Sequence, residues 1–351
     1  MLKRPYLAAL VFALVNAPLA TQAADTGARP LDILITNGHI IDGSGSPWFS
    51  ADVGIRDGRI AAIGKLDHAR AKQRINADGK VIAPGFIDVL GQSELTILVD
   101  ARVPSKIFQG ITTEITGEGE SVAPLRGEAL TQMQPLLDHL HIRADWHDFD
   151  GYFARLERQG IGINLASYVG ATTVREIVIG VENRAPAPEE LVRMRGLVRE
   201  AMEQGAVGVS SALEYPPAPY ASTEELIALA DEAARFGGIY ATHMRSYGDT
   251  MDVALDETLR IAREAQIPVE ILHMEIAGKL NWGSMPEIVR KIDEARAHGL
   301  DIATVRCRNQ IAADGKERDI YLGEEARLLP QHTPRLELAR EGPHLRLHEV
   351  Q

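Results

Sequence analysis

This 351-residue sequence has a single cysteine and fewer basic than acidic residues, and each shortage excludes a class of protein. The only cysteine is Cys307, so the chain can form neither an intramolecular disulfide nor a zinc site built from several thiolates. The 37 Lys and Arg residues are outnumbered by 49 Asp and Glu residues, for a net charge of −12. Because nucleic acid and anionic membranes attract clustered positive charge, a small-molecule substrate is the expected partner instead.

One apolar run stands out near the N-terminus, where basic residues precede Tyr6 to Leu19 and small residues follow. This order is typical of a secretory signal peptide, so residues 1–24 are predicted to be removed and the protein to be exported, into the periplasm or the medium. The alternative is an uncleaved anchor, which is disfavoured because the run is shorter than the ~20 residues that span a bilayer. No stable membrane insertion is expected after removal.

Two regions with different patterns of apolar residues follow. Residues 31–64 show short alternating apolar runs broken by Asn-Gly, Gly-Ser and Asp-Gly pairs, which predict three or four antiparallel strands. We therefore assign residues 25–80 to a small β-sandwich portion. From residue 81 apolar strands alternate with amphipathic helical stretches, which predicts a parallel sheet with helical crossovers at residues 81–305. The expected strands are 81–89, 111–116, 163–170, 206–213, 238–244, 268–275 and 300–305.

The expected fold is α/β, with an incomplete (β/α)8 TIM-type barrel of about seven strands. An open doubly wound sheet is disfavoured because no glycine-rich phosphate-binding fingerprint follows the first strand at Asp88. Residues 306–351 form an atypical tail rich in Arg, His, Pro and Leu, without a further strand and helix. We interpret the tail as out-of-frame translation with the genuine C-terminal part lost; the alternative is an irregular extension.

Two histidines end consecutive predicted strands. His243, in YATHMRSYGD, and His273, in EILHMEIAGKL, lie thirty positions apart, which is one strand-helix unit. Active sites of such barrels lie at the carboxyl ends of the strands, so both imidazoles are expected in the same mouth. Two neutral imidazoles placed in this way suit zinc.

A carboxylate is needed to complete such a site. Glu118 is the first choice, because it follows the second strand and lies between two glycines that allow a sharp turn. Glu114 and Glu120 remain alternatives. Glu118 could also be a solvent-exposed loop acid with no role in metal binding. His141, His147 and His298 show no comparable placement.

Seven segments together resemble the N-acyl-D-amino-acid deacylase (D-aminoacylase) branch of the amidohydrolase superfamily, from about residue 32 to 305. They are DILITNGHIIDGSG, DGRIAAIGKL, VIAPGFIDV, GITTEITGEGESVAPL, SSALEYPPAPYAS, YATHMRSYGD and LHMEIAGKLNWG. The resemblance implies a zinc-dependent hydrolase that cleaves the amide of N-acyl-D-amino acids by metal-activated water. It also implies that His243, His273 and a second-strand residue, here Glu118, bind the metal.

The chain departs from the family pattern at several points. Leu90 and Gln92 replace a His-x-His pair that holds a second, weaker metal in relatives, so a single Zn2+ is expected. The family's acid-base aspartate ends an eighth strand that this sequence lacks, so no catalytic residue is assigned, and Asp314 is not offered in its place. Two alternatives stay open: an inactive member that binds metal without turnover, or a cyclic-amide hydrolase of the same superfamily.

Four residues are predicted to contact the substrate. Ser211, Tyr215 and Tyr220 lie in a segment that lines the pocket in relatives, and Arg245 is placed to pair with a substrate carboxylate. For Arg245 the alternative is a structural ion pair with Asp249 or another nearby acid.

Overall fold

The computed structural model describes residues 29–305 and, for the backbone alone, residues 310–311, 317–318, 335–341 and 344–350. The predicted signal peptide at residues 1–24 and most of the tail at 306–351 lie outside the described residues, so these stay predictions. In the described part, no helix is both long enough and apolar enough to cross a bilayer. The chain divides into two compact units, Met1–Pro84 and Gly85–Gln351.

The described part of the first unit is a single five-stranded sheet. Its strands are β1 (Leu31–Ile40), β2 (Phe49–Arg56), β3 (Arg59–Gly64), β4 (Ala71–Asn76) and β5 (Val81–Ile82). As predicted, β2 and β3 pair antiparallel across an Asp57-Gly58 turn in which both residues have positive φ. The antiparallel strands predicted for residues 31–64 are confirmed, because β1 also pairs antiparallel with β2. Strands β4 and β5, which lie beyond that range, pair parallel with β1.

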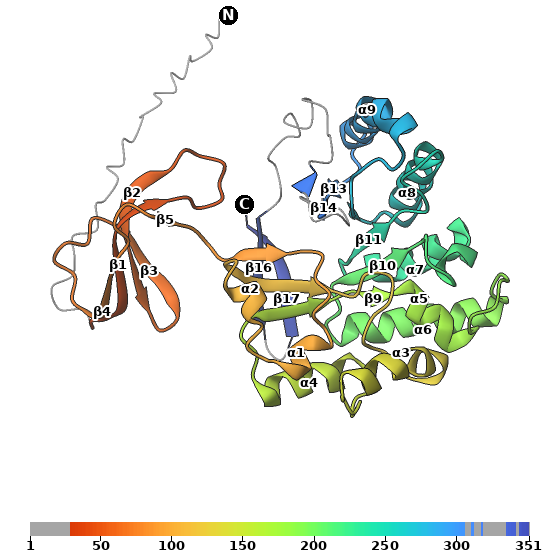
Figure 1. Cartoon of the computed structure of the whole chain (residues 1–351), viewed down its shortest axis with the longest axis horizontal. Coiled ribbons are helices and arrows are strands. Elements are labelled where there is room, and N and C mark those ends of the chain that lie inside the picture. Colours follow the sequence, from red (N-terminus) through yellow and green to blue (C-terminus); the bar gives the residue numbers. More distant parts are fainter. Residues whose placement is uncertain (1–28, 306–309, 312–316, 319–334, 342–343, 351) are drawn as a thin grey trace, which may run out of the picture. The chain divides into compact units, whose positions relative to one another are not determined.

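The second unit is an α/β barrel wall made of two parallel sheets (Figure 1). The first sheet contains β6 (Phe86–Asp88), β7 (Ile111–Thr116) and β8 (Asn164–Ser167). The second contains β9 (Val169–Gly170), β10 (Gly208–Ala212), β11 (Ile239–His243), β12 (Val269–Ile271) and β13 (Ile302–Thr304). Within each sheet the spatial order follows the sequence, as it does around a barrel.

Two predicted strands are each divided in the structure. Residues 81–82 pair with β1 in the first unit, and the barrel strand begins only at β6, so the observed division of the chain lies after the predicted boundary at residue 80. The predicted strand 163–170 is interrupted at Tyr168: β8 pairs with β7, and β9 pairs with β10.

Helices connect the strands of the second unit. They are α1 (Thr96–Val99), α2 (Pro104–Ile107), α3 (Gly127–His139), α4 (Phe149–Gln159), α5 (Ala171–Val178), α6 (Pro188–Glu203), α7 (Thr223–Ala234), α8 (Met251–Ala265) and α9 (Met285–Ala297), with short 3-10 turns η1 (Ala218–Tyr220) and η2 (Lys279–Ser284). The predicted alternation of strands with amphipathic helical stretches is confirmed, and α7 and α9 are examples of such helices. Helix α7 begins where the Ser222 hydroxyl accepts a hydrogen bond from the Glu225 N–H, at 3.2 Å.

The two faces of the barrel wall are packed by different residues. Because side chains alternate along a strand, Tyr240 of β11 joins the large core shared with the helices, while Ala241 joins a small cluster on the opposite, interior face. That interior cluster consists of Ile115, Ala166, Tyr168, Ala241 and Leu272. The tail contributes two antiparallel hairpins, β14 (Gln310–Ile311) with β15 (Glu317–Arg318) and β16 (Arg335–Glu341) with β17 (His344–Val350).

Candidate metal centre

Glu118 is presented by a sharp turn directly after β7. Gly117 has φ +91° and Gly119 has φ +69°, a backbone region that side chains disfavour, so the prediction that flanking glycines shape this turn is confirmed. A Cβ at Gly119 would also lie 2.4 Å from the Ala212 Cβ, so the turn packs tightly against β10. Both constraints fix where the carboxylate can lie.

The Ser210 hydroxyl holds this turn from the neighbouring strand. It accepts a hydrogen bond from the Gly119 N–H at 3.0 Å and donates to the carbonyl of Gly117. The Ser210 side chain is fully buried, so these bonds are shielded from water. Sequence reasoning missed Ser210 because its contact partner lies 91 residues away.

His243 and His273 are brought to the same carboxylate, as the sequence predicted. His243 is the last residue of β11, and its Nδ1 lies 3.3 Å from Glu118 Oε1. His273 follows β12 with a left-handed φ of +51°, and its Nε2 lies 2.8 Å from the same oxygen. The left-handed conformation of His273 breaks the extended backbone just after β12, and its ring faces the Glu118 carboxylate.

The three side chains suit a divalent ion. One donor atom from each lies within 4.8 Å of the other two. Tetrahedral zinc with bonds of ~2.0–2.1 Å places its ligand atoms about 3.4 Å apart, so modest adjustment would bring all three into coordination. The set leaves a fourth position open, as in catalytic sites.

The alternative carboxylates do not reach this cluster in the described structure. Glu114 is fully buried in β7, with its Oε1 3.1 Å from Lys106 Nζ. Glu120 is exposed and is not part of the three-residue group. The geometry therefore favours Glu118 over both.

The site's charges depend on one another in the ion-free chain. Burial disfavours the Glu118 carboxylate, but hydrogen bonds with His243 and His273 outweigh this and lower its pKa to about 2. Burial likewise disfavours the His243 imidazolium, yet Glu118 and Glu214 raise its pKa above the usual value. In the absence of an ion, the site therefore favours ionised Glu118 and protonated His243 more than water would.

Glu214 and Tyr247 support the histidines, and sequence analysis assigned neither. Glu214 Oε2 lies 3.3 Å from His243 Nε2, the ring nitrogen opposite the one that faces Glu118. The Tyr247 hydroxyl donates to the Leu272 carbonyl at 2.6 Å and accepts from the Met244 N–H at 3.0 Å. Tyr247 thus joins the residues adjacent to the two histidines. Its place in the YATHMRSYGD segment was the available signal.

Ser211 does not face the interior of the barrel, which contradicts its predicted contact with substrate. Its buried hydroxyl lies 2.6 Å from the Tyr240 hydroxyl and 2.9 Å from the Thr242 hydroxyl. Tyr240 belongs to the core shared with the helices, so Ser211 belongs to the outer face and Ser210 to the inner one. Of the two adjacent serines, Ser210 faces the interior and the predicted Ser211 does not.

The Arg245 guanidinium is hydrogen-bonded to other parts of the protein. Its Nε and Nη2 donate to Glu257 of α8, both at 2.9 Å, and its Nη1 and Nη2 donate to the carbonyls of Pro219 and Ala221. The predicted pairing with a substrate carboxylate is therefore not supported, whereas the alternative of a structural ion pair is. The partner is Glu257 instead of Asp249.

The two predicted substrate-contacting tyrosines remain accessible. Tyr215 is 59% exposed, and its ring centroid lies 5.2 Å from that of His243. Tyr220 ends η1 and is partly buried. Their predicted roles stay predictions.

The positions that depart from the family pattern lie close to the cluster. Leu90 packs against the interior apolar cluster, as an apolar side chain should. Gln92 donates its amide Nε2–H to Glu118 Oε2 at 3.1 Å. Neither position offers an imidazole.

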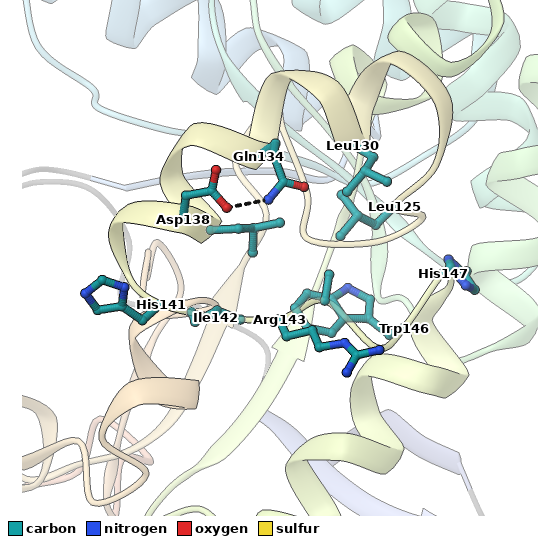
Figure 2. Close-up of a pocket in the computed structure, with 11 residues that line it drawn as sticks. Leu125, Leu130, Gln134, Asp138, His141, Ile142, Arg143, Trp146 and His147 are labelled. Carbon is teal, nitrogen blue, oxygen red and sulfur yellow. Dashed lines mark hydrogen bonds between the residues drawn. The ribbon is translucent and has the colours of Figure 1, made fainter.

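A separate hollow of about 460 Å3 lies between α3 and the loop that follows it. Figure 2 shows His141 and His147 on opposite sides of this hollow, so they do not converge as metal ligands would. The one hydrogen bond drawn there joins Gln134 to Asp138 along α3, at 2.7 Å.

Comparison with known proteins finds relatives over most of the described chain. Residues 15–85 match the family of the urease alpha-subunit N-terminal domain. A D-aminoacylase of Alcaligenes xylosoxydans xylosoxydans is 40% identical over 275 residues, which are 78% of this chain and 57% of the relative.

Two solved structures are similar over the same region. One is a D-aminoacylase with a binuclear metal centre, activated by one metal and attenuated by the second; it is 38% identical with a TM-score of 0.74, over 79% of this chain and 58% of that one. The other is an N-acyl-D-glutamate deacylase from Bordetella bronchiseptica complexed with zinc and a phosphonate inhibitor, 36% identical with a TM-score of 0.72 at the same coverage. This chain spans about half the length of the curated relatives it matches. Over the matched part, the chain belongs to the N-acyl-D-amino-acid deacylase (D-aminoacylase) family of amidohydrolases.

Proposed function

We propose that this protein is a zinc-dependent hydrolase that cleaves the amide bond of N-acyl-D-amino acids and uses a single ion. The observation that carries the proposal is the convergence of Glu118, His243 and His273, one ligand atom of each lying within 4.8 Å of the others. Glu118 Oε1 lies 3.3 Å from His243 Nδ1 and 2.8 Å from His273 Nε2. Its support from relatives is the family's amide chemistry and the zinc held by the Bordetella enzyme.

The chain's own residues would organise the reaction as follows. Glu118, His243 and His273 would hold the ion, which when bound supplies Lewis acidity that polarises a carbonyl and lowers the pKa of water. Glu214 would accept the Nε2–H of His243, which fixes the tautomer with Nδ1 free to coordinate. Tyr247 would keep the two strand ends in register through its bonds to Leu272 and Met244.

Substrate binding would fall to the exposed side of the cluster. The Tyr215 ring stands beside His243 and leaves most of its surface accessible, so it would contact the acyl or amino acid part of the substrate. Arg245 is not proposed for the substrate carboxylate, because its guanidinium is already paired with Glu257.

The test is amino acid release by the zinc-loaded full chain from N-acetyl-D-methionine and N-acetyl-D-glutamate, compared with their L-isomers. We expect release from a D-substrate, one zinc per chain by elemental analysis, and loss of both in His273→Ala. His298→Ala is the matched control, because His298 is exposed and bonds only locally, with Nδ1 2.6 Å from the Glu294 carbonyl. Stoichiometric zinc without release would contradict the activity and leave the alternative of ion binding without turnover.

A further inference from the structure

The two oxygens of Glu118 have different partners. Oε1 lies 2.8 Å from His273 and 3.3 Å from His243, whereas Oε2 accepts the side-chain amide N–H of Gln92 at 3.1 Å. A neutral amide N–H is a donor and cannot displace the imidazoles from an ion. Gln92 therefore occupies Oε2 and leaves Oε1 free to face His243 and His273.

Gln92 lies on a loop that is anchored on both sides of it. The Gly91 N–H donates to the Ile115 carbonyl at 2.8 Å, and the Ser93 N–H donates to Glu114 Oε1 at 3.2 Å. Both acceptors belong to β7, the strand that leads to Glu118. The loop and the carboxylate are thus held by the same strand.

The anchor is buried and charged. Glu114 is fully buried, and Lys106 Nζ lies 3.1 Å from its Oε1 and 2.6 Å from Asp88 Oδ2. A Cβ at Gly91 would lie 1.9 Å from Glu114 Oε1, so the loop approaches this carboxylate closely enough to exclude any side chain there. The backbone under Gln92 is therefore tightly constrained, although the Gln92 side chain itself is exposed.

We propose that Gln92 is a positioning residue of the metal centre: its hydrogen bond to Oε2 makes Glu118 a one-oxygen ligand through Oε1. The proposal rests on the proposed function, because it presumes that Glu118 and the histidines bind metal. Hydrogen bonds to ligating carboxylates set ligand orientation, and their loss typically weakens metal binding 10–100-fold.

The test compares Gln92→Met with Gln132→Met. Methionine keeps the length of glutamine but removes the donor, and Gln132 makes the same type of bond, to Glu128 Oε1 at 2.6 Å, on the exposed face of α3. Affinities for Zn2+ are measured by competition with a chromogenic chelator, and the visible spectrum of the Co2+-loaded protein reports coordination.

We expect Gln92→Met to bind Zn2+ about 10–100-fold more weakly and to change the Co2+ spectrum, with Gln132→Met matching the unaltered protein. Gln92→Ala, which removes the donor with a different shape, should behave like Gln92→Met. Unaltered affinity in both Gln92 variants would overturn the proposal, as would weaker affinity with an unaltered Co2+ spectrum. If the unaltered protein bound no ion, the metal centre itself would be refuted; if it bound zinc but released no amino acid, only the hydrolase activity would fail.

Discussion

At the scale of single residues, Glu176 carries a buried carboxyl whose protonation differs from that in an unfolded chain. It lies in α5 with 5% of its surface exposed, and burial, followed by the charges of Glu120 and Glu128, raises its pKa to about 7 from 4.5. Because the folded chain holds this proton more tightly, the free energy of unfolding falls as pH rises from about 4.5 through 7.

We therefore predict that Glu176→Gln stabilises the protein above pH 7 and has little effect near pH 5. The gain at pH 8.5 should be roughly 1–3 kcal/mol, which the pKa shift allows as an upper range. Urea unfolding of both proteins at pH 5 and pH 8.5 measures it. An equal difference between the two proteins at both pH values would contradict the assignment, since other titrating groups are common to both.

Residues at the ends of strands were the most predictable part of the site. His243 and His273 could be found because equal positions in consecutive strand-helix units meet at one barrel edge, and Glu118 because glycines flank it. The partners of Arg245 and Gln92 could not be found, since Glu257 and Glu118 reach them only through the folded chain. Ser211 was misassigned because adjacent serines in a strand point to opposite faces, and the sequence does not say which face is inside.

At the scale of elements, the pairing of β10 with β11 depends on a glycine. A Cβ at Gly208 would lie 2.0 Å from the Ile239 carbonyl oxygen, so a larger residue must push the two strands apart. We predict that Gly208→Ala lowers the free energy of unfolding by roughly 1–3 kcal/mol. It should also weaken metal binding, because β11 carries His243.

The matched control is Gly196→Ala in the middle of α6, where an added Cβ meets nothing within 4 Å. That change should instead stabilise the protein by about 1 kcal/mol, through the higher helix propensity of alanine. Urea denaturation of both variants and the unaltered protein, under one condition, measures the two changes in the free energy of unfolding. Equal effects of the same sign would refute the reading of both sites.

Elements with strong periodicity were predicted well, and interrupted ones were not. The amphipathic patterns of α7 and α9 mark their helices directly. The division of residues 163–170 at Tyr168 arises because the pairing partner changes from β7 to β10. The pattern of apolar residues does not indicate which strand pairs with which. Strand β4 lies outside the residues for which strands were predicted, and its parallel pairing with β1 is likewise a property of the pair, which the sequence of one strand does not show.

At the scale of the whole molecule, metal should contribute to stability as well as to chemistry. An ion that binds only the folded chain stabilises it by about 2.7 kcal/mol at a free concentration 100 times its dissociation constant. We predict that chelation of zinc lowers the midpoint of thermal unfolding and that zinc restores it. His273→Ala should show no response, while His298→Ala should respond like the unaltered protein; a shift retained in His273→Ala would place the ion elsewhere.

The interruption at Tyr168 has a mechanical consequence for this centre. Glu118 follows β7, on the side of the wall that ends at β8, while both histidines follow strands on the side that begins at β9. The Ser210 hydroxyl on β10 bonds to Gly117 and Gly119 across this interruption, so the carboxylate is tied to the sheet that carries the imidazoles. An ion held by all three side chains would add a second cross-link between the two sheets, beside the one that Ser210 already makes.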